Sequence, residues 1–289
     1  MAIRRSKKKK IAVRPGRREN VGPSSHQEFQ KVPKKIYQER PADSPIVSCT
    51  CITYARVSLL EEAIECFLRQ NALGISELVV VNDFDQQTLI FDHPRVTIVN
   101  LPKRCQTIGE KRNIASNLSK GKYLMPWDDD DIHLPDRISR LYDFASCGNH
   151  RHVTQGAYYS LKTNGHYEIN YHSHAGMHLL EKDLWEEVGE YTEMNSEEDQ
   201  DLNKKLRSIV KPVKCSILPP EFIYRWSTTK RPHLSGFGKD SDGKISGTVK
   251  IQKIAEQNVK SGSEPKGIVH LKPYWSKDWV QDLRKKGHT

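Results

Sequence analysis

The sequence predicts an α/β fold in which a mostly parallel sheet is flanked by helices. From residue 45 onward, short apolar runs of strand length alternate with segments whose apolar residues recur at helical spacing. Alternation of this kind is typical of a parallel sheet with helices on its faces. Polar clusters also follow three of the apolar runs, and sheets of this class bind ligands beyond the carboxyl ends of their strands.

The first strand and the first helix are predicted on either side of a polar turn. Residues 46–52 form an apolar run, and apolar residues recur at helical spacing from 60 to 68. This helix should stop before Gly74. Ser58 and Glu61 have the spacing of a capping box, in which each side chain accepts a hydrogen bond from the other's free backbone N–H, so Ser58 is expected to cap the helix.

The remaining elements are predicted by the same criteria. Strands are expected at residues 78–81, 95–101, 122–127 and 222–226, and helices at 109–119, 203–210 and 245–259. Pro135 can open a further helix, because proline is tolerated at the first helical position. Trp275 and Trp279 are four residues apart and are expected to pack together on one helix face.

Four consecutive aspartates, Asp128 to Asp131, directly follow an apolar run. Side chains of an extended segment alternate faces, so Asp128 and Asp130 should point one way and Asp129 and Asp131 the other. Carboxylates this close repel each other, and a divalent cation relieves the repulsion. Mg²⁺ and Mn²⁺ take oxygen ligands, usually one or two carboxylates together with substrate phosphates. A solvated acidic turn is the alternative.

Three polar clusters, at residues 53–56, 82–85 and 128–131, each follow a predicted strand. The carboxyl ends of parallel strands meet at one edge of a sheet, so these clusters should converge although they are far apart in sequence. That convergence favours a binding site over three unrelated turns.

The basic charge of the chain is concentrated at its N-terminus. The net charge of the 289 residues is +10, and residues 1–40 contain 13 Lys and Arg against 3 Asp and Glu. Because this stretch has few apolar residues, residues 1–44 are expected to be a disordered tail. The tail can bind nucleic acid or an anionic membrane surface, or serve only solubility or targeting. Residues 236–289 are a second basic extension, with 11 Lys and Arg against 6 Asp and Glu.

Membrane insertion and secretion are not expected. No apolar run approaches the roughly 18 residues that cross a bilayer, and no apolar segment follows the N-terminal charges as in a secretory signal. The six cysteines lack metal-site spacing, and reduced thiols are the default in the cytosol. A cytoplasmic protein is therefore expected, with the cytoplasm of a virus-infected host cell as one option.

The order of motifs resembles family 2 glycosyltransferases over roughly residues 46–235. VSCTCITYAR is similar to their opening strand followed by Pro-Thr-Tyr-Asn-Arg, VVVND to their second strand with its acidic pair, and GEKRN to their Gly-x-x-x-Arg-Asn helix. DDDDIHLP resembles their Asp-x-Asp-Asp segment, and EDQDL their Glu-Asp-x-Asp-Leu motif. The motifs stand at residues 47–56, 79–83, 109–113, 128–135 and 198–202.

The resemblance implies a GT-A fold for residues 45–235, a nucleotide-sugar donor, Mn²⁺ or Mg²⁺, and inversion at the anomeric carbon. By position, the nucleotide pocket would be lined by Thr53, Tyr54 and Arg56. Asp83 would accept a hydrogen bond from the base, and Arg112 would support the nucleotide side.

The resemblance also assigns the metal and the catalytic base. Asp128 would lie near the ribose and contribute to the metal site, Asp130 would hold the metal, and Asp131 is a candidate to share it. Asp199 would be the catalytic base, with Glu198 orienting the acceptor. The alternative for Glu198 and Asp199 is an acidic first turn that favours the helix dipole.

A late basic loop supplies further candidates. Lys230, Arg231 or His233 would contact the diphosphate, and His233 would ligate the metal; a plain surface loop is the alternative. Four further histidines are expected on acceptor-side loops or on the surface, with metal binding as the alternative: His166, His172, His174 and His178.

The sequence departs from the family pattern at the nucleotide end. Ile52 and Ala55 stand where the family has Pro and Asn, and Asn82 and Phe84 replace an acid and a common Gly. A UDP-sugar donor is expected, although these changes concern the residues that would recognise the base.

Several acceptors and one non-catalytic function fit the sequence. The basic tail favours a nucleic-acid acceptor such as a hydroxymethylated base in viral DNA, which would have to flip out of the duplex to react. A cell-surface glycan or lipid-linked sugar is the rival acceptor. A nucleic-acid binding protein on a transferase scaffold is a third hypothesis. A nucleotidyltransferase is disfavoured, because residues 53–58 contain no Gly.

Overall fold

The computed structural model describes residues 38–173, 176–216, 218–225, 227–228, 231–232 and 247–288. The strands are β1 Val47–Thr53, β2 Ser76–Asn82, β3 Gln87–Ile90, β4 Val96–Asn100, β5 Tyr123–Pro126, β6 Ile132–His133, β7 His152–Gln155, β8 Tyr158–Leu161, β9 Tyr167–Asn170, β10 His178–Glu181, β11 Val213–Cys215, β12 Phe222–Tyr224, β13 Ser227–Thr228, β14 Arg231–Pro232 and β15 Gly267–His270. The helices are α1 Val57–Leu68, α2 Ile108–Leu118, α3 Arg137–Gly148, α4 Lys182–Glu187, α5 Glu198–Ile209, α6 Gly247–Lys260 and α7 Trp279–Lys285, with a 3₁₀ turn at Leu73–Ile75.

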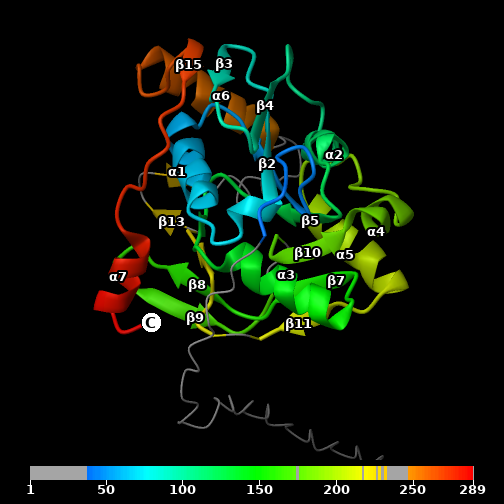
Figure 1. The fold of residues 1–289 in the computed structure, drawn as a ribbon. Coiled ribbons are helices and arrows are strands. Elements are labelled where there is room, and N and C mark those ends of the chain that lie inside the picture. The colour runs from blue at the N-terminus through cyan, green and yellow to red at the C-terminus, as the bar shows by residue number, and fades with distance from the viewer. Residues whose placement is uncertain are drawn as a thin grey trace, which may run out of the picture. The chain divides into compact units, whose positions relative to one another are not determined.

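A seven-stranded sheet forms the centre of the fold, in the order β11-β7-β10-β5-β1-β2-β4 (Figure 1). Strands β5, β1, β2 and β4 are parallel to one another, and β10 is antiparallel to both β5 and β7. Long apolar runs suit this arrangement, because helices cover both faces of a parallel sheet. The predicted α/β class with a mostly parallel sheet is therefore confirmed.

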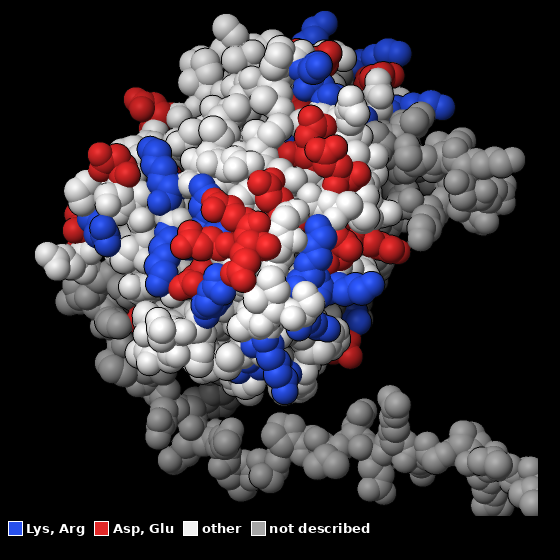
Figure 2. All heavy atoms as spheres, turned by 90° about the vertical axis from the view of Figure 1, so that its right-hand side faces the viewer, with Lys and Arg blue, Asp and Glu red and all other residues white. Residues whose placement is uncertain are grey.

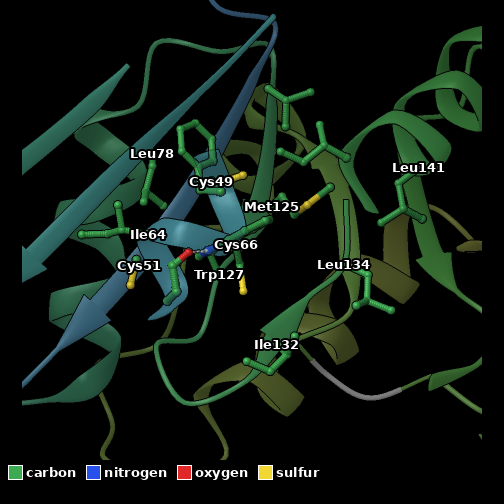
Figure 3. Packing of buried hydrophobic residues seen from close by; sticks show 14 of the residues in the cluster. Cys49, Cys51, Ile64, Cys66, Leu78, Met125, Trp127, Ile132, Leu134 and Leu141 are labelled. Carbon is green, nitrogen blue, oxygen red and sulfur yellow. Dashed lines mark hydrogen bonds between the residues drawn. The ribbon is translucent and has the colours of Figure 1, made fainter. Parts of the chain in front are cut away.

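The two faces of the sheet are separated by the alternation of side chains along each strand. In β5, Tyr123 and Met125 join the core with α1, α3 and α7, whereas Leu124 packs with the apolar residues of α4 and α5 on the other face. Figure 3 shows Met125 and Trp127 within the first of these cores, close to Cys49 and Cys66. Trp127 is fully buried and donates from Nε1 to the Ala63 carbonyl at 3.0 Å. Each such large apolar side chain contributes about 1.5–3 kcal/mol when buried.

Smaller sheets complete the molecule. A four-stranded sheet has the order β6-β12-β8-β9, and β15 pairs in parallel with β3. Most of these strands have two to four residues, and only β12 among the four strands of the second sheet was predicted. Strand β15 belongs to the C-terminal extension, so this extension is part of the fold.

The predicted strands 46–52, 78–81, 95–101 and 122–127 are confirmed as β1, β2, β4 and β5 within one or two residues. The first two predicted helices are confirmed as α1 and α2, and the residues after Pro135 form α3. The later predictions at 222–226 and 245–259 match β12 and α6. Helix α5 begins at Glu198, five residues before the predicted start at 203.

Two local predictions were wrong. Ser58 is the second residue of α1 and does not cap it, because the helix begins at Val57 with Arg56 as the N-cap residue. The Val57 N–H is instead bonded by the Glu264 carboxylate at 3.2 Å. Trp275 precedes α7 and Trp279 begins it, so the two rings do not share a helix face, although both pack against the main core.

All six cysteines are free thiols, and four of them are buried. Cys49 and Cys51, two residues apart in β1, are both fully buried, and burial raises the pKa of each thiol. In the part of the chain that the structure describes, no helix combines the length and the apolar character needed to span a bilayer.

Candidate active site

The three predicted polar clusters meet at one edge of the central sheet. Strands β1 and β2 run in parallel and end level with each other, with Thr53 opposite Asn82, and β5 runs parallel to β1 on its other side. The segments that follow these three strands therefore lie together at the carboxyl edge. This is the convergence that the sequence predicted.

The four aspartates after β5 alternate between buried and partly exposed positions. Asp129 and Asp131 are 1% exposed, whereas the side chains of Asp128 and Asp130 are 25% and 13% exposed. The segment is a turn and not an extended strand, but the expected division into two pairs holds. Residues 128–131 are called the acidic loop below. Its two partly exposed carboxylates are the ones that can reach a ligand.

Arg56 neutralises one side of the acidic loop. Its guanidinium contacts Asp129 at 2.6 Å and Asp130 at 2.9 Å. Burial alone would lower the pKa of Arg56, but the two carboxylates raise it above its ordinary value. Burial raises the pKa of Asp129 to about 6 against the opposing charge of Arg56. The sequence predicted Arg56 only as part of the nucleotide pocket, and these contacts with the acidic loop were not predicted.

Asp83, the residue expected to recognise the base, is paired with a buried lysine. Asp83, which is 4% exposed, accepts from Lys111 Nζ at 2.5 Å and from the Cys105 backbone N–H at 3.1 Å. Lys111 also donates to the Thr53 carbonyl, which ties the end of β1 to the end of β2. Burial lowers the pKa of Lys111 although Asp83 opposes this effect. Both oxygens of Asp83 are thus engaged within the protein.

Tyr54 provides a flat surface beside this pair. The Arg104 guanidinium lies over its ring at 4.2 Å, and the edge of Phe84 approaches it with the ring centroids 5.0 Å apart. Phe84 and Ala55 pack with Ala255 of α6 in a small buried cluster. The C-terminal extension therefore forms one wall of this end of the site.

Arg112 joins the acidic loop to the start of α5. Its guanidinium bonds Asp128 Oδ1 at 3.3 Å and Glu198 Oε1 at 3.0 Å. The two acids raise the pKa of Arg112 well above its ordinary value, although burial works in the opposite direction. Glu198 is followed by Asp199, so two acidic motifs about 70 residues apart in sequence flank the same cation.

Helix α2 also fixes the loop that leads into α5. Asn113 exchanges two hydrogen bonds of 2.9 Å with the backbone of Tyr191. The Gly109 N–H donates to the Met194 carbonyl at 3.2 Å. A Cβ atom at Gly109 would overlap the Thr192 carbonyl oxygen, so the close approach of this loop requires glycine. The GEKRN motif thus positions residues 191–198 as well as the acidic loop.

Asp199 lies in the first turn of α5 and is partly exposed. Its Oδ1 accepts from the Gln200 N–H at 2.7 Å. An acidic first turn also favours the helix dipole, so local structure and a catalytic role are compatible at this position.

Comparison with known sequences decides the family. The profile of glycosyl transferase family 2 matches residues 48–210, more than half of the chain. The chain belongs to this family. No protein with a curated description matches the sequence.

Solved structures with the family 2 fold resemble the chain at low sequence identity. S. aureus TarS 1–349 in complex with UDP-GlcNAc has 15% identity and a TM-score of 0.52, covering 73% of this chain and 71% of that one. A second structure of TarS 1–349 has 15% identity and a TM-score of 0.51, covering 62% of this chain and 60% of that one. The chain thus spans less than two thirds of the length of the second structure. The mannosyltransferase PcManGT from Pyrobaculum calidifontis, in complex with GDP-Man and Mn²⁺, has 16% identity, a TM-score of 0.49, and coverage of 76% and 68%.

The acidic loop of this family 2 domain has donors suited to a divalent cation. The described residues include no group of three or more His, Cys, Asp and Glu side chains that would by itself hold a metal. A magnesium-type site needs only one or two carboxylates, since substrate phosphates and water supply the other oxygens. Asp129 Oδ2 is buried and has no hydrogen-bond partner among the described residues, and Asp128 and Asp130 are partly exposed. The loop therefore fits such a cation.

The other predicted metal ligands are placed less favourably or lie outside the described residues. Asp131 is buried, and its Oδ1 accepts from the Arg225 N–H at 2.9 Å. Burial and the neighbouring Asp130 raise the pKa of Asp131 well above its ordinary value. Arg231 belongs to β14, but its side chain is not among those described, and His233 lies outside the described residues. The roles of these three residues stay predictions.

His178 was expected on a loop or on the surface, and this was wrong. It begins β10, is 1% exposed, and lies against His152 of β7 with ring centroids 5.5 Å apart. Buried histidines inside paired strands contribute to the sheet interior and not to an acceptor loop.

Three residues of the site carried no assigned role in the sequence analysis. Lys111 lies inside a quoted motif, and Arg225 lies inside the predicted strand 222–226, but neither position shows its partner in the sequence. Glu62 is fully buried on α1. The sequence could have shown it, because Glu62 stands on the same side of the predicted helix as Leu59 and Ala63, which face the core. A carboxylate buried there requires a partner.

Proposed function

We propose that the chain transfers a sugar from a nucleoside diphosphate sugar to an acceptor hydroxyl, with inversion at the anomeric carbon. The observation that carries this proposal is Arg112, which bonds Asp128 of the acidic loop and Glu198 beside Asp199. Membership of glycosyl transferase family 2 supports the reaction class. With the donor bound at the acidic loop and Asp199 of α5 as the base, the leaving group and the attacking hydroxyl would lie at one site.

In this proposal Asp199 accepts the proton of the acceptor hydroxyl as oxygen attacks the anomeric carbon. A carboxylate in this role typically contributes ~10²–10⁴-fold to the rate. Glu198 is held by Arg112 and would orient the acceptor. The bond that breaks joins the anomeric carbon to the diphosphate oxygen, and the diphosphate leaves with the electron pair.

The divalent cation would be held by Asp130 and Asp128 together with the diphosphate oxygens. When bound, Mn²⁺ or Mg²⁺ supplies neutralisation of the negative charge that develops on the departing diphosphate. Asp131 is a weaker candidate, because its carboxylate is buried against the Arg225 backbone.

We propose UDP-sugar as the donor class. Tyr54 would stack on the base, and Thr53 and Arg56 would line the nucleotide pocket. TarS 1–349, which shares the fold, forms a complex with UDP-GlcNAc, and this supports the choice. Recognition by Asp83 would have to reuse a carboxylate already bonded to Lys111, and a carboxylate with about four lone-pair sites can accept a further bond.

The experiment is a donor panel. The full chain is incubated with UDP-, GDP-, dTDP- and CDP-sugars and Mn²⁺ or Mg²⁺, and release of the nucleoside diphosphate is measured. Release from a UDP-sugar that is lost in Asp130→Ala and in Asp199→Ala would support the proposal. Release that survives both substitutions would overturn it.

For the acceptor, we propose a hydroxymethylated base in DNA, which would place the reaction in the cytoplasm of an infected cell. The supporting observation is that residues 1–40 hold the whole net positive charge. Figure 2 shows a face of the described part on which Asp and Glu side chains occupy the middle and Lys and Arg lie around them. Attraction to phosphate would therefore come mainly from the tail.

DNA binding and transfer can be tested together. Affinity for hydroxymethylated duplex DNA should fall steeply with salt, because each neutralised phosphate releases counterions, and should fall when residues 1–37 are removed. The glycan alternative would be favoured by two results together. The affinity for DNA would change neither with salt nor on removal of residues 1–37, and parallel assays would show sugar transfer to a glycan or lipid-linked acceptor.

A further inference from the structure

The acidic loop is fastened from behind by a buried arginine. Arg225, which follows β12, donates from Nε to the Asp130 carbonyl at 2.6 Å and from its backbone N–H to Asp131 Oδ1 at 2.9 Å. These bonds fix the backbone of the loop without occupying the partly exposed carboxylates of Asp128 and Asp130. Arg225 is itself 8% exposed, so its charge needs a buried acid.

That acid is Glu62 of α1, which lies at the meeting point of three chain segments. Its Oε2 accepts from Arg225 Nη1 at 2.5 Å, and both side chains are at most 8% exposed. Its Oε1 accepts from Ser276 Oγ at 2.6 Å, from the Ser276 N–H at 3.0 Å and from Trp279 Nε1 at 3.1 Å. The carboxylate thus joins Arg225 on one side to the C-terminal extension on the other.

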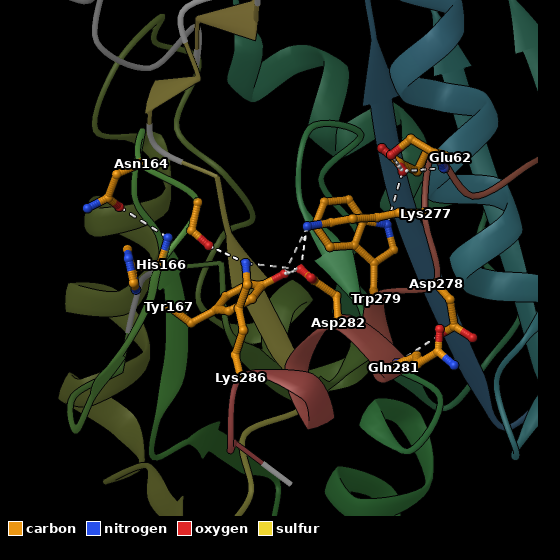
Figure 4. Close-up of polar contacts among 12 residues, drawn as sticks. Glu62, Asn164, His166, Tyr167, Lys277, Asp278, Trp279, Gln281, Asp282 and Lys286 are labelled. Carbon is orange, nitrogen blue, oxygen red and sulfur yellow. Dashed lines mark hydrogen bonds and ion pairs between the residues drawn. The ribbon is translucent and has the colours of Figure 1, made fainter.

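The C-terminal segment that supplies these donors is anchored elsewhere in the fold. Residues 271–288 are called the C-terminal brace here. Within it, Asp282 accepts hydrogen bonds from Tyr167 of β9 and from Lys277, and Tyr159 of β8 donates to the His288 carbonyl at 2.8 Å. Figure 4 shows Trp279 directed to Glu62, and Asp282 directed to Tyr167 and Lys277.

We infer that Glu62 is a positioning residue, and that the C-terminal brace sets the acidic loop through Glu62 and Arg225. The inference rests on the proposed function only in taking the acidic loop as the donor-binding segment. Every link in the route is a hydrogen bond between buried or partly buried groups, where the low dielectric strengthens each bond. Within the described residues, Arg225 Nη2 is the one guanidinium nitrogen of this network without a hydrogen-bond partner. The Arg225 guanidinium also lies over the Trp279 ring, 5.7 Å from its centroid, which gives a second contact between brace and arginine.

Two substitutions separate the halves of the route. Glu62→Gln keeps an oxygen for Ser276 and Trp279 but removes the negative charge that Arg225 needs. Ser276→Ala keeps the Arg225 pair and removes one donor of the brace, the Oγ hydroxyl, while the backbone N–H of residue 276 remains. Tyr167→Phe is the matched control, because it removes a hydrogen bond of the brace to β9 and leaves the contacts of Glu62 in place.

The readout is amide hydrogen exchange of peptides covering residues 128–132, together with KM and kcat for the donor and Mn²⁺ binding followed by electron paramagnetic resonance. Exchange in the acidic loop should rise about tenfold in Glu62→Gln, as expected when a buried charge loses its partner, and a few-fold in Ser276→Ala. It should change less than about twofold in Tyr167→Phe. Mn²⁺ affinity should fall and the KM for the donor should rise in the same order of variants.

The outcomes distinguish positioning from stability. Loop exchange and Mn²⁺ affinity that stay at wild-type values in Glu62→Gln, while the melting temperature falls, would overturn the inference. If the wild-type chain shows no sugar transfer, the exchange data still test the route from brace to loop, and only the proposed function fails.

Discussion

Ala55 adopts a left-handed backbone conformation, with φ at 49°. Family 2 sequences commonly carry Asn at this place in the motif, and Asn is enriched several-fold among the non-glycine residues that adopt positive φ. Alanine has no side-chain group to compensate, so the turn costs about 1–2 kcal/mol. The turn is nevertheless kept, because Ala55 is buried against Phe84 and Ala255 and leads directly into α1.

Replacing Asp199 by Asn should reduce kcat by ~10²–10⁴-fold while leaving donor KM close to wild type, because the amide cannot accept the acceptor proton. The measurement is steady-state release of nucleoside diphosphate in the presence of acceptor. Gln200→Ala, next to Asp199 on α5, is the control and should keep full activity. A kcat for Asp199→Asn within threefold of wild type would assign the base to another residue.

Gly109→Ala should destabilise the fold by about 1–3 kcal/mol, since the new methyl group overlaps the Thr192 carbonyl and the loop must move. Helix propensity alone predicts the opposite sign, because Ala is about 1 kcal/mol better than Gly inside a helix. Urea denaturation decides between the two effects. Asn117→Ala, at an exposed position of the same helix, should be neutral or slightly stabilising.

At the scale of single elements, β1, β2 and β5 could be predicted because each is a run of residues buried on both faces of the sheet, and the edge strand β4 because residues 96–99 are all β-branched. The N-terminus of α1 could not, because the group that bonds its first N–H is Glu264, 207 residues away. Ser58 and Glu61 have the spacing of a capping box, but the acceptor for the first N–H of the helix is the distant Glu264. Strands β6, β8 and β9 have two to four residues each, too few to show a period.

The strand pair β7 and β10 should make stability depend on pH. Burial lowers the pKa of His152 to about 4 and that of His178 well below its ordinary value. Below pH 6.5 the unfolded chain takes up protons that the folded chain does not bind, so the free energy of unfolding should fall as pH drops from 6.5 towards 4. For His152 the loss should approach about 3 kcal/mol, since tenfold in proton affinity corresponds to ~1.4 kcal/mol.

The check is urea denaturation between pH 4 and 7 for wild type and for His152→Leu, which removes one of the two titrating rings. The variant should show a shallower decline than wild type. His166→Gln changes an exposed histidine and should leave the decline as it is. Equal pH dependence in wild type and His152→Leu would show that carboxylates elsewhere cause it.

At the scale of the whole molecule, the sequence indicated the fold class and which three segments converge, because sheet topology brings them together. It did not indicate the partners inside the site. Lys111 and Asp83, or Arg225 and Glu62, are ion pairs between residues 28 and 163 positions apart, and side-chain pairing at such distances depends on packing that no local pattern records. The C-terminal extension was likewise separated from the domain by composition, although its residues Leu271, Trp279 and Leu283 belong to the main core.

Removing residues 247–288 should abolish cooperative unfolding, because Leu271, Trp279 and Leu283 are buried members of the main core. Near-ultraviolet circular dichroism and dye binding to exposed apolar surface are the measurements. Removing residues 1–37, a stretch with few apolar residues, should leave the transition unchanged. A cooperative transition at the wild-type temperature after the C-terminal removal would show that the extension is dispensable for folding.

The pairing of β15 with β3 has a consequence for biosynthesis. Strand β3 ends at Ile90, and its partner β15 ends at His270, so the ribosome must add about 180 further residues before the partner can leave the exit tunnel. Until then this edge of the nascent chain presents unpaired backbone groups, which favour association with other chains. Translation speed and chaperone supply should therefore influence the yield of this protein more than its final stability would indicate.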